Sequence, residues 1–256
     1  MNSAASVPRI FAEPRRVNRT LRSERRRRQG PDAARFIIDD ICDDIIERLA
    51  FVRHTPGRSL VIGACSAELA AFLRLSDGFL HADHTADPAQ PIAGGPYDLA
   101  AIVGQLDAVN DLPGALIHLR YALAPGGLAI ASFVGGASLP RLRAAMLAAD
   151  GERPAARIHP MVDHRAAPQL LQRAGWKDPV VDTHRLTVRY SSLDRLVNDL
   201  RDQGLTGALA DPAPPLGKAA LERARAAFLA LADDDGKVSE TFEIITLTGR
   251  RSLAGR

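Results

Sequence analysis

The chain has 256 residues, of which 46% are hydrophobic and 25% are charged. These values are typical of one folded domain with a real core, and they exclude collagen, a disulfide-stapled mini-protein and disorder throughout. The sequence contains no run of eighteen apolar residues, so we expect no membrane span and no secretory signal, and we predict a cytoplasmic location. Cys42 and Cys65 are the two cysteines, and we expect both thiols to stay reduced.

The positive charge is concentrated at the N-terminus. Residues 1–30 hold nine arginines and two glutamates, so this arm carries +7, and the rest of the chain carries −4 when the whole chain carries +3. A basic arm can bind an anionic partner or dock on an acidic face of its own domain. Its one aromatic residue, Phe11, gives no stacking platform, so we do not expect nucleic acid as a partner. A transit peptide would have a similar composition, and that alternative stays open.

Hydrophobic periodicity predicts alternating helices and strands after the arm. Apolar residues recur at helical spacing from Phe36 to about Val52, and acidic residues between Asp39 and Glu47 form an outer stripe that could receive the arm. Later in the chain we predict strands at 59–63, 79–82, 97–103, 128–134, 180–188 and 240–247, and helices at 66–75, 112–123, 139–149, 166–174, 192–203 and 218–231. This alternation predicts an α/β fold with a doubly wound, mostly parallel sheet, and the two late strands predict an antiparallel pair at one edge.

Several short segments, in a fixed order, resemble one protein family. They are Ile10-Phe11, Tyr97-Asp98-Leu99, Val109 to Pro113, Leu123 to Gly127, Phe133 to Gly136 with Leu139 and Leu142-Arg143, Arg173 to Trp176, Asp199 to Arg201, Phe242 to Ile244 and Leu247 to Gly249. Together they resemble the class I S-adenosylmethionine (SAM) dependent methyltransferases. Within that superfamily they are most similar to methyltransferase-like assembly factors of respiratory complex I and to the carrier-protein methyltransferase of biotin synthesis.

The resemblance implies a Rossmann-like methyltransferase domain. We divide the chain into an arginine-rich helical arm at 1–30 and a domain at 31–256, in which residues 139–231 include a helical cover. The family is associated with SAM-dependent methylation, and its mitochondrial assembly factor with arginine hydroxylation. A protein partner bound through the arm is the partner that we expect, and the sequence leaves the oligomeric state open.

The cofactor loop departs from the family pattern. Active relatives carry an acid on the first strand and then glycines at alternating positions, where the backbone must approach SAM closely. Here Gly63 is retained, but Val61 stands at the acid position, and Cys65 and Ala67 stand at glycine positions. Cys65 adds a side chain where the backbone has to meet the ligand. The resemblance therefore predicts a degenerate SAM motif.

The segment after the second strand is also short. Between Asp83 and Tyr97 the chain has too few residues and too many prolines and glycines for a helix and a strand. We therefore predict that an edge strand and the adenine wall are missing. If SAM binds, its contacts are expected at Gly63, Ala64, Cys65, Asp83 and Gln105, with Asp83 on the ribose; a loop carboxylate that caps a turn is the alternative for Asp83.

Other groups of polar residues offer weaker alternatives. His81, Asp83 and His84 look like part of a non-heme iron triad, but strand alternation separates them, and we predict no metal. Cys65 is either a reactive thiol at a helix start or a small buried filler. In a separate loop, His159, Asp163 and His164 could contact substrate. Asn110 and Asp111 are interpreted as helix caps, and Trp176 as a packing residue.

We expect a methyltransferase-like protein that does not catalyse and acts as a binding or assembly factor. The alternatives are a working SAM-dependent methyltransferase with an altered cofactor loop and, third, a protein arginine hydroxylase. No catalytic residue is identified from the sequence, because no Ser-His-Asp triad or Walker-type loop is legible.

Overall fold

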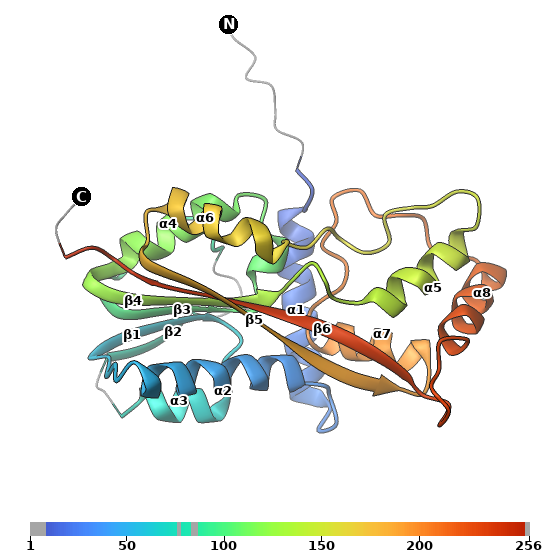
Figure 1. Ribbon diagram of the computed structural model, residues 1–256, viewed down its shortest axis with the longest axis horizontal. Coiled ribbons are helices and arrows are strands. Elements are labelled where there is room, and N and C mark those ends of the chain that lie inside the picture. Colours follow the sequence, from blue (N-terminus) through green and yellow to red (C-terminus); the bar gives the residue numbers. More distant parts are fainter. Residues whose placement is uncertain (1–8, 76–77, 83–86, 254–256) are drawn as a thin grey trace, which may run out of the picture.

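The computed structural model describes residues 9–75, 78–82 and 87–253 (Figure 1). The helices are α1 (Glu13–Gln29), α2 (Phe36–Phe51), α3 (Ala67–Leu73), α4 (Leu112–Ala122), α5 (Pro140–Asp150), α6 (Ala167–Ala174), α7 (Leu193–Asp202) and α8 (Lys218–Leu229). The strands are β1 (Arg58–Gly63), β2 (Gly78–Ala82), β3 (Tyr97–Val103), β4 (Leu123–Val134), β5 (Lys177–Tyr190) and β6 (Val238–Arg250). Each helix and strand predicted from periodicity is present.

The strands form one sheet in the order β2-β1-β3-β4-β6-β5. The first four strands in this order are parallel to one another, whereas β6 pairs antiparallel with both β4 and β5. The predicted α/β class, with its antiparallel C-terminal pair, is therefore confirmed. Residues 87–96, which are the described part of the connection from β2 to β3, form no strand, and β2 lies at the edge of the sheet that the structure describes.

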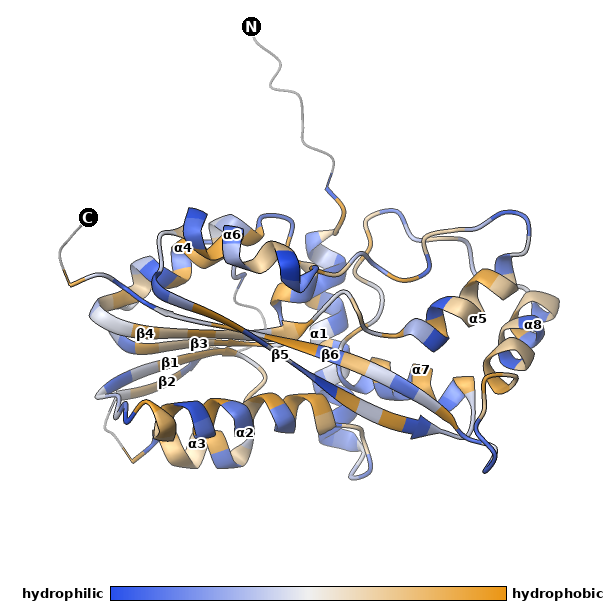
Figure 2. Ribbon diagram, in the orientation of Figure 1, coloured by the Kyte–Doolittle hydropathy of each residue, from blue (hydrophilic) through white to orange (hydrophobic). Residues whose placement is uncertain are grey.

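Helices cover both faces of the sheet. In Figure 1, α2 and α3 lie below the parallel strands, and α4 and α6 lie above them. Alternate side chains of the strands supply the two cores: Val61 and Leu99 pack with Ile41 and Ile45 of α2, whereas Ile102 belongs to the core under α4 and α6. The central strands β3 and β4 are mostly apolar, as Figure 2 shows, because a parallel strand inside a sheet is buried on both faces.

The C-terminal helices α5, α7 and α8 pack around the far ends of β5 and β6 (Figure 1). Glu240 of β6 is fully buried and accepts hydrogen bonds from the backbone N–H groups of Arg141 (3.2 Å) and Leu142 (2.8 Å) at the start of α5. Burial raises the pKa of Glu240 even though these backbone N–H groups act in the opposite direction. A single carboxylate thus fixes α5 to the sheet.

One detail of the sequence prediction differs in the structure. Pro125-Gly126-Gly127 was expected to lie between a helix and a strand, but these residues belong to the first, extended part of β4, where Gly126 and Gly127 hydrogen-bond to the backbone of Arg251. Trp176 packs as predicted: it is buried, and its indole N–H donates to the carbonyl of Leu116 at 3.0 Å.

In the described residues, none of the helices combines the length and apolar character that crossing a bilayer requires.

Candidate functional site

The turn after β1 is tightly closed. Gly63 ends the strand with φ of +99°, and a Cβ atom built on it would overlap the carbonyl oxygen of Val103 on β3. Ser66 then caps α3 by accepting a hydrogen bond from the backbone N–H of Leu69 at 3.1 Å. Val61, at the position where the family pattern has an acid, is fully buried in the core under α2. This end of β1 is therefore apolar and packed.

The next two residues of the loop, Ala64 and Cys65, line a cavity of about 250 Å³. The cavity is also lined by His81 at the end of β2. The remaining lining residues belong to α1 (Glu24, Arg27 and Arg28), to the residue before α2 (Arg35) and to α2 itself (Ile38). Burial raises the pKa of the Cys65 thiol to about 12, so the thiol stays protonated near neutral pH. The structure thus favours the interpretation of Cys65 as an unreactive filler.

Gln105 lies just after β3 and is buried. Neither its amide oxygen nor its amide nitrogen has a hydrogen-bond partner, and the same is true of Nε2 of Gln203. Both glutamines line a cavity of about 30 Å³, whose other lining residues come from α1, the end of β3, Ala64, Ile38 and Gly204. That volume holds about one water molecule. Little space is therefore left beside Gln105 at the carboxyl end of β3.

Helix α1 lies against this region: it crosses the direction of the strands at the carboxyl ends of β1 and β3 (Figure 1). Arg19 of α1 is buried and donates two hydrogen bonds to Asp107, at 3.0 and 2.8 Å. His159, also buried, contacts the same carboxylate at 3.1 Å. Burial by itself raises the pKa of Asp107, but the charge of Arg19 and the hydrogen bond with His159 outweigh it and lower the pKa to about 2. Asp107 is thus a buried anion held from two sides.

Further contacts fix both ends of α1. Arg26 forms an ion pair with Asp202 at 2.5 Å, and Arg16 forms one with Asp87 at 3.2 Å. Ahead of the helix, the side chain of Asn110 accepts from the backbone N–H of Phe11 at 3.0 Å and donates to its carbonyl at 2.9 Å. The interpretation of Asn110 as a helix cap is therefore wrong: it clamps the chain that leads into α1.

Asp111, by contrast, caps α4 as predicted, because it accepts a hydrogen bond from the backbone N–H of Gly114 at 2.8 Å.

The acidic stripe of α2 was expected to receive the arm. The two carboxylates of the stripe described next contact other partners instead. Asp40 contacts His184 of β5 at 2.6 Å, and Asp44 bonds to Arg48 at 2.7 Å within its own helix. The reason is geometric: these carboxylates face β5 and β6, while α1 lies beside α7.

Asp83 and His84 lie outside the described residues, so the ribose contact predicted for Asp83 stays a prediction. Within the residues that are described, His, Cys, Asp and Glu side chains form no group able to hold a metal ion. Of the loop histidines, His159 is buried against Asp107, and His164 contacts Glu243 at 3.1 Å. The structure therefore brings Ala64 and Gln105 to one cavity and places Cys65 in the neighbouring one. It adds Arg19 and Gln203 to the lining beside Gln105, and the sequence did not single out these two residues.

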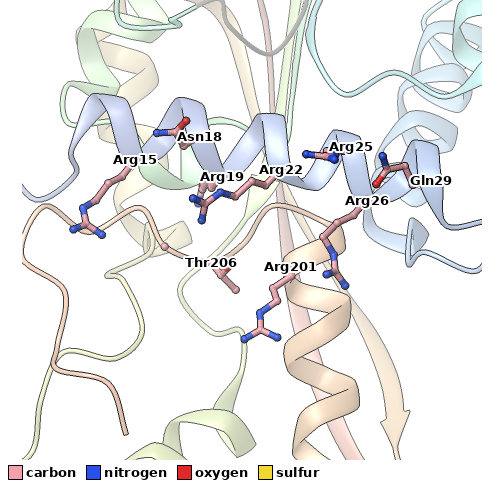
Figure 3. Close-up of a pocket in the computed structure, with 10 residues that line it drawn as sticks. Arg15, Asn18, Arg19, Arg22, Arg25, Arg26, Gln29, Arg201 and Thr206 are labelled. Carbon is pink, nitrogen blue, oxygen red and sulfur yellow. The ribbon is translucent and has the colours of Figure 1, made fainter.

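The opposite face of α1 opens on a basic basin of about 500 Å³ (Figure 3). Its wall holds six arginines and no carboxylate: Arg15, Arg19, Arg22, Arg25, Arg26 and Arg201, with Asn18, Gln29, Thr206 and Gly207. Arg19 and Arg26 are paired with aspartates, but no ion pair is found for Arg15, Arg22, Arg25 or Arg201 with the residues that the structure describes. The basin therefore carries a concentrated positive charge.

Comparison with known proteins gives a consistent class. No family model matches the chain. A malonyl-(acyl-carrier protein) O-methyltransferase of Coxiella burnetii is 27% identical over 80% of this chain and 77% of its own. The human protein named arginine-hydroxylase NDUFAF5, mitochondrial, is 30% identical over 62% of this chain, and the match spans about half (47%) of its length. A candidate methyltransferase from Bacillus halodurans has a similar fold, with a TM-score of 0.51 and 12% identity over 80% of this chain and 98% of that one.

The fold and these relatives point to one class of protein. The chain has a methyltransferase-like fold and is similar in sequence to members of the class I SAM-dependent methyltransferase superfamily. Within it, the similarity extends both to malonyl-(acyl-carrier protein) O-methyltransferases and to the mitochondrial arginine hydroxylases.

The residues at the carboxyl ends of β1 and β3 do not fit SAM. Sites for ligands of this size have volumes of about 300–1,000 Å³, whereas the cavity beside Gln105 has about 30 Å³. The larger cavity beside Cys65 has about 250 Å³, which is also below that range, and its charged lining residues are Arg27, Arg28 and Arg35 with one acid, Glu24. The three arginines have a charge of the same sign as the sulfonium. No step of methyl transfer is therefore derived from this arrangement.

Proposed function

We propose that this chain is a methyltransferase-like binding factor that does not transfer methyl groups and that serves in assembly, as the resemblance to complex I assembly factors suggests. The observation that carries the proposal is the insertion of α1, held by Arg19 and Asp107, at the end of the sheet where the superfamily binds its cofactor. A valine at the acid position and an arginine-lined cavity beside Cys65 support it further.

Calorimetric titration of the full chain with SAM and with S-adenosylhomocysteine tests this proposal. We expect no heat of binding up to millimolar ligand, because the cavity beside Gln105 holds only about one water molecule. A SAM-binding methyltransferase of the same superfamily serves as the positive control. Micromolar binding of either ligand to this chain would overturn the proposal.

The second candidate is a working methyltransferase in which α1 moves aside. The specific observation in its favour is the set of unpartnered amide atoms on Gln105 and Gln203, which are the kind of groups a polar ligand would satisfy. The double variant Arg19→Met/Asp107→Asn removes the buried ion pair that holds α1. If the variant binds SAM and the natural chain does not, α1 is the block; if both bind, the second candidate is correct.

We propose that a protein partner docks on the exposed arginines of α1. Arg15 and Arg25 are exposed at different places along the helix and have no ion pair with the described residues. We expect the double variant Arg15→Gln/Arg25→Gln to lose the proteins that the natural chain retains from a lysate of its source cells. Arg173→Gln, which alters an exposed arginine of α6, is the matched control and should retain them. If the double variant retains the same proteins, this docking site is wrong.

A further inference from the structure

Behind the basic basin lies a second cavity of different character. It has about 280 Å³ and is lined mainly by aliphatic side chains of α5, α7 and the loop that follows α7, among them Leu142, Met146, Val197, Leu200 and Leu205. Thr206 and Gly207 line both this cavity and the basin, so the two adjoin at that segment. The aliphatic cavity therefore adjoins a cluster of arginines at Thr206 and Gly207.

The walls of the two cavities share one buried anchor. Arg19 lines the basin and His159 lines the aliphatic cavity, and both are bound to the carboxylate of Asp107. Nε of Arg19 is buried and has no hydrogen-bond partner, although its two terminal nitrogens are engaged by Asp107. A buried N–H donor without a partner is unfavourable, and an anion bound beside Arg19 is the kind of group that would satisfy it.

Two more arginines line the basin together with Thr206. Figure 3 shows Arg22 of α1 and Arg201 of α7 on either side of Thr206. Arg201 donates to the neutral side-chain oxygen of Asn198 at 3.2 Å, and neither arginine is paired with a carboxylate of the described residues. Arginine binds phosphate through paired N–H groups, and a phosphate ester carries about −1.5 to −2 charges at pH 7.

From this juxtaposition we infer that the cavities bind one amphipathic ligand: a short alkyl or prenyl chain that ends in a phosphate or diphosphate. The alkyl or prenyl part of the ligand occupies the aliphatic cavity, and its phosphate head group lies among Arg19, Arg22 and Arg201. A nucleotide fits less well, because none of the residues that line the basin is aromatic and could stack on a base. This inference concerns a ligand inside the fold and goes beyond the proposed function, since it does not depend on whether SAM binds.

Geranyl diphosphate and inorganic diphosphate, titrated separately into the full chain, test the inference. We expect geranyl diphosphate to bind about tenfold more tightly than diphosphate, because only the first fills the aliphatic cavity. Vesicles that contain phosphatidic acid form a third arm, which distinguishes a soluble ester from a lipid head group. Equal binding of geranyl diphosphate and diphosphate, binding of vesicles alone, or no binding of any probe would overturn the inference.

Two variants separate the halves of the site. Arg22→Gln/Arg201→Gln should weaken geranyl diphosphate by about tenfold or more, since both residues are exposed and their loss should leave the fold intact. Ala213→Phe places a ring in the aliphatic cavity from its half-exposed loop, and it should weaken geranyl diphosphate while leaving inorganic diphosphate unchanged. Arg173→Gln is the control for charge. Loss of binding equal to that of Arg22→Gln/Arg201→Gln in this control would show that the attraction is not local and would contradict the inference.

Discussion

Replacement of Arg19 by methionine is expected to destabilise the protein by about 3–5 kcal/mol, because it leaves a buried carboxylate without its main counter-charge. Asp107 is 2% exposed and would keep only the contact with His159. The free energy of unfolding, measured by urea titration at pH 7, gives the size of the effect. Addition of Asp107→Asn to the variant should recover at least half of the loss, since the unpaired charge is then removed.

Arg16→Met is the matched control for Arg19→Met. Both arginines lie on α1, and their side chains are equally hidden, at 3% and 6% exposure. The acids that pair with Arg16 remain in contact with water, because Glu13 is 45% and Asp87 21% exposed. We therefore expect a loss of about 1 kcal/mol. If Arg16→Met and Arg19→Met lower the free energy of unfolding equally, the burial of Asp107 is not what makes its ion pair with Arg19 important.

The pH dependence of unfolding gives an independent readout of the same pair. The pKa of Asp107 in the folded chain is about 2, below its ordinary value of 3.8. A lowered folded pKa stabilises the protein above the unfolded value, so this contribution is complete above about pH 4 and is lost as the pH falls towards 2. In Arg19→Met, burial raises the pKa of Asp107 instead. The difference in stability between the natural chain and the variant should therefore shrink on acidification from pH 7 to about pH 4.

Much of the fold could be predicted because apolar periodicity and chain breakers are local signals. The run at 97–103 and the helix after Asp111 are examples, and the breaker-rich connection before Tyr97 correctly indicated that residues 87–96 hold no strand. The two glycine departures in the cofactor loop were also legible from sequence. They predict a crowded loop, and this stays a prediction: Cys65 lines a cavity of about 250 Å³, whereas the cavity of about 30 Å³ beside Gln105 is lined by Ala64 and not by Cys65.

The insertion of α1 could not be predicted in the same way. Arg16, Arg19 and Ser23 are its buried residues, and hydropathy marks all of them as surface residues. Arg19 and Asp107 are separated by 88 positions, so no local spacing connects them. Nine similar arginines in one arm also give no sign of which one is buried. The long acidic stripe of α2 was the stronger signal in the sequence, yet the carboxylates that receive α1 are isolated: Asp87, Asp107 and Asp202.

Gly63→Ala is expected to destabilise the chain by about 3 kcal/mol or more. A φ of +99° is strained for any residue with a side chain, and the added methyl group would also overlap the carbonyl of Val103 in the buried sheet. Gly236→Ala is the matched control: its φ is +76°, but a Cβ there meets open space, so strain alone should cost about 1 kcal/mol.

The difference between the two variants in urea unfolding measures the contact between β1 and β3 apart from the backbone strain. It also decides how the retained glycine is interpreted. A large difference means that the packing of the sheet requires Gly63 even without a cofactor, so this glycine alone is no sign of SAM binding. If Gly63→Ala and Gly236→Ala cost the same, the space at the end of β1 is open, and a ligand could approach the backbone there.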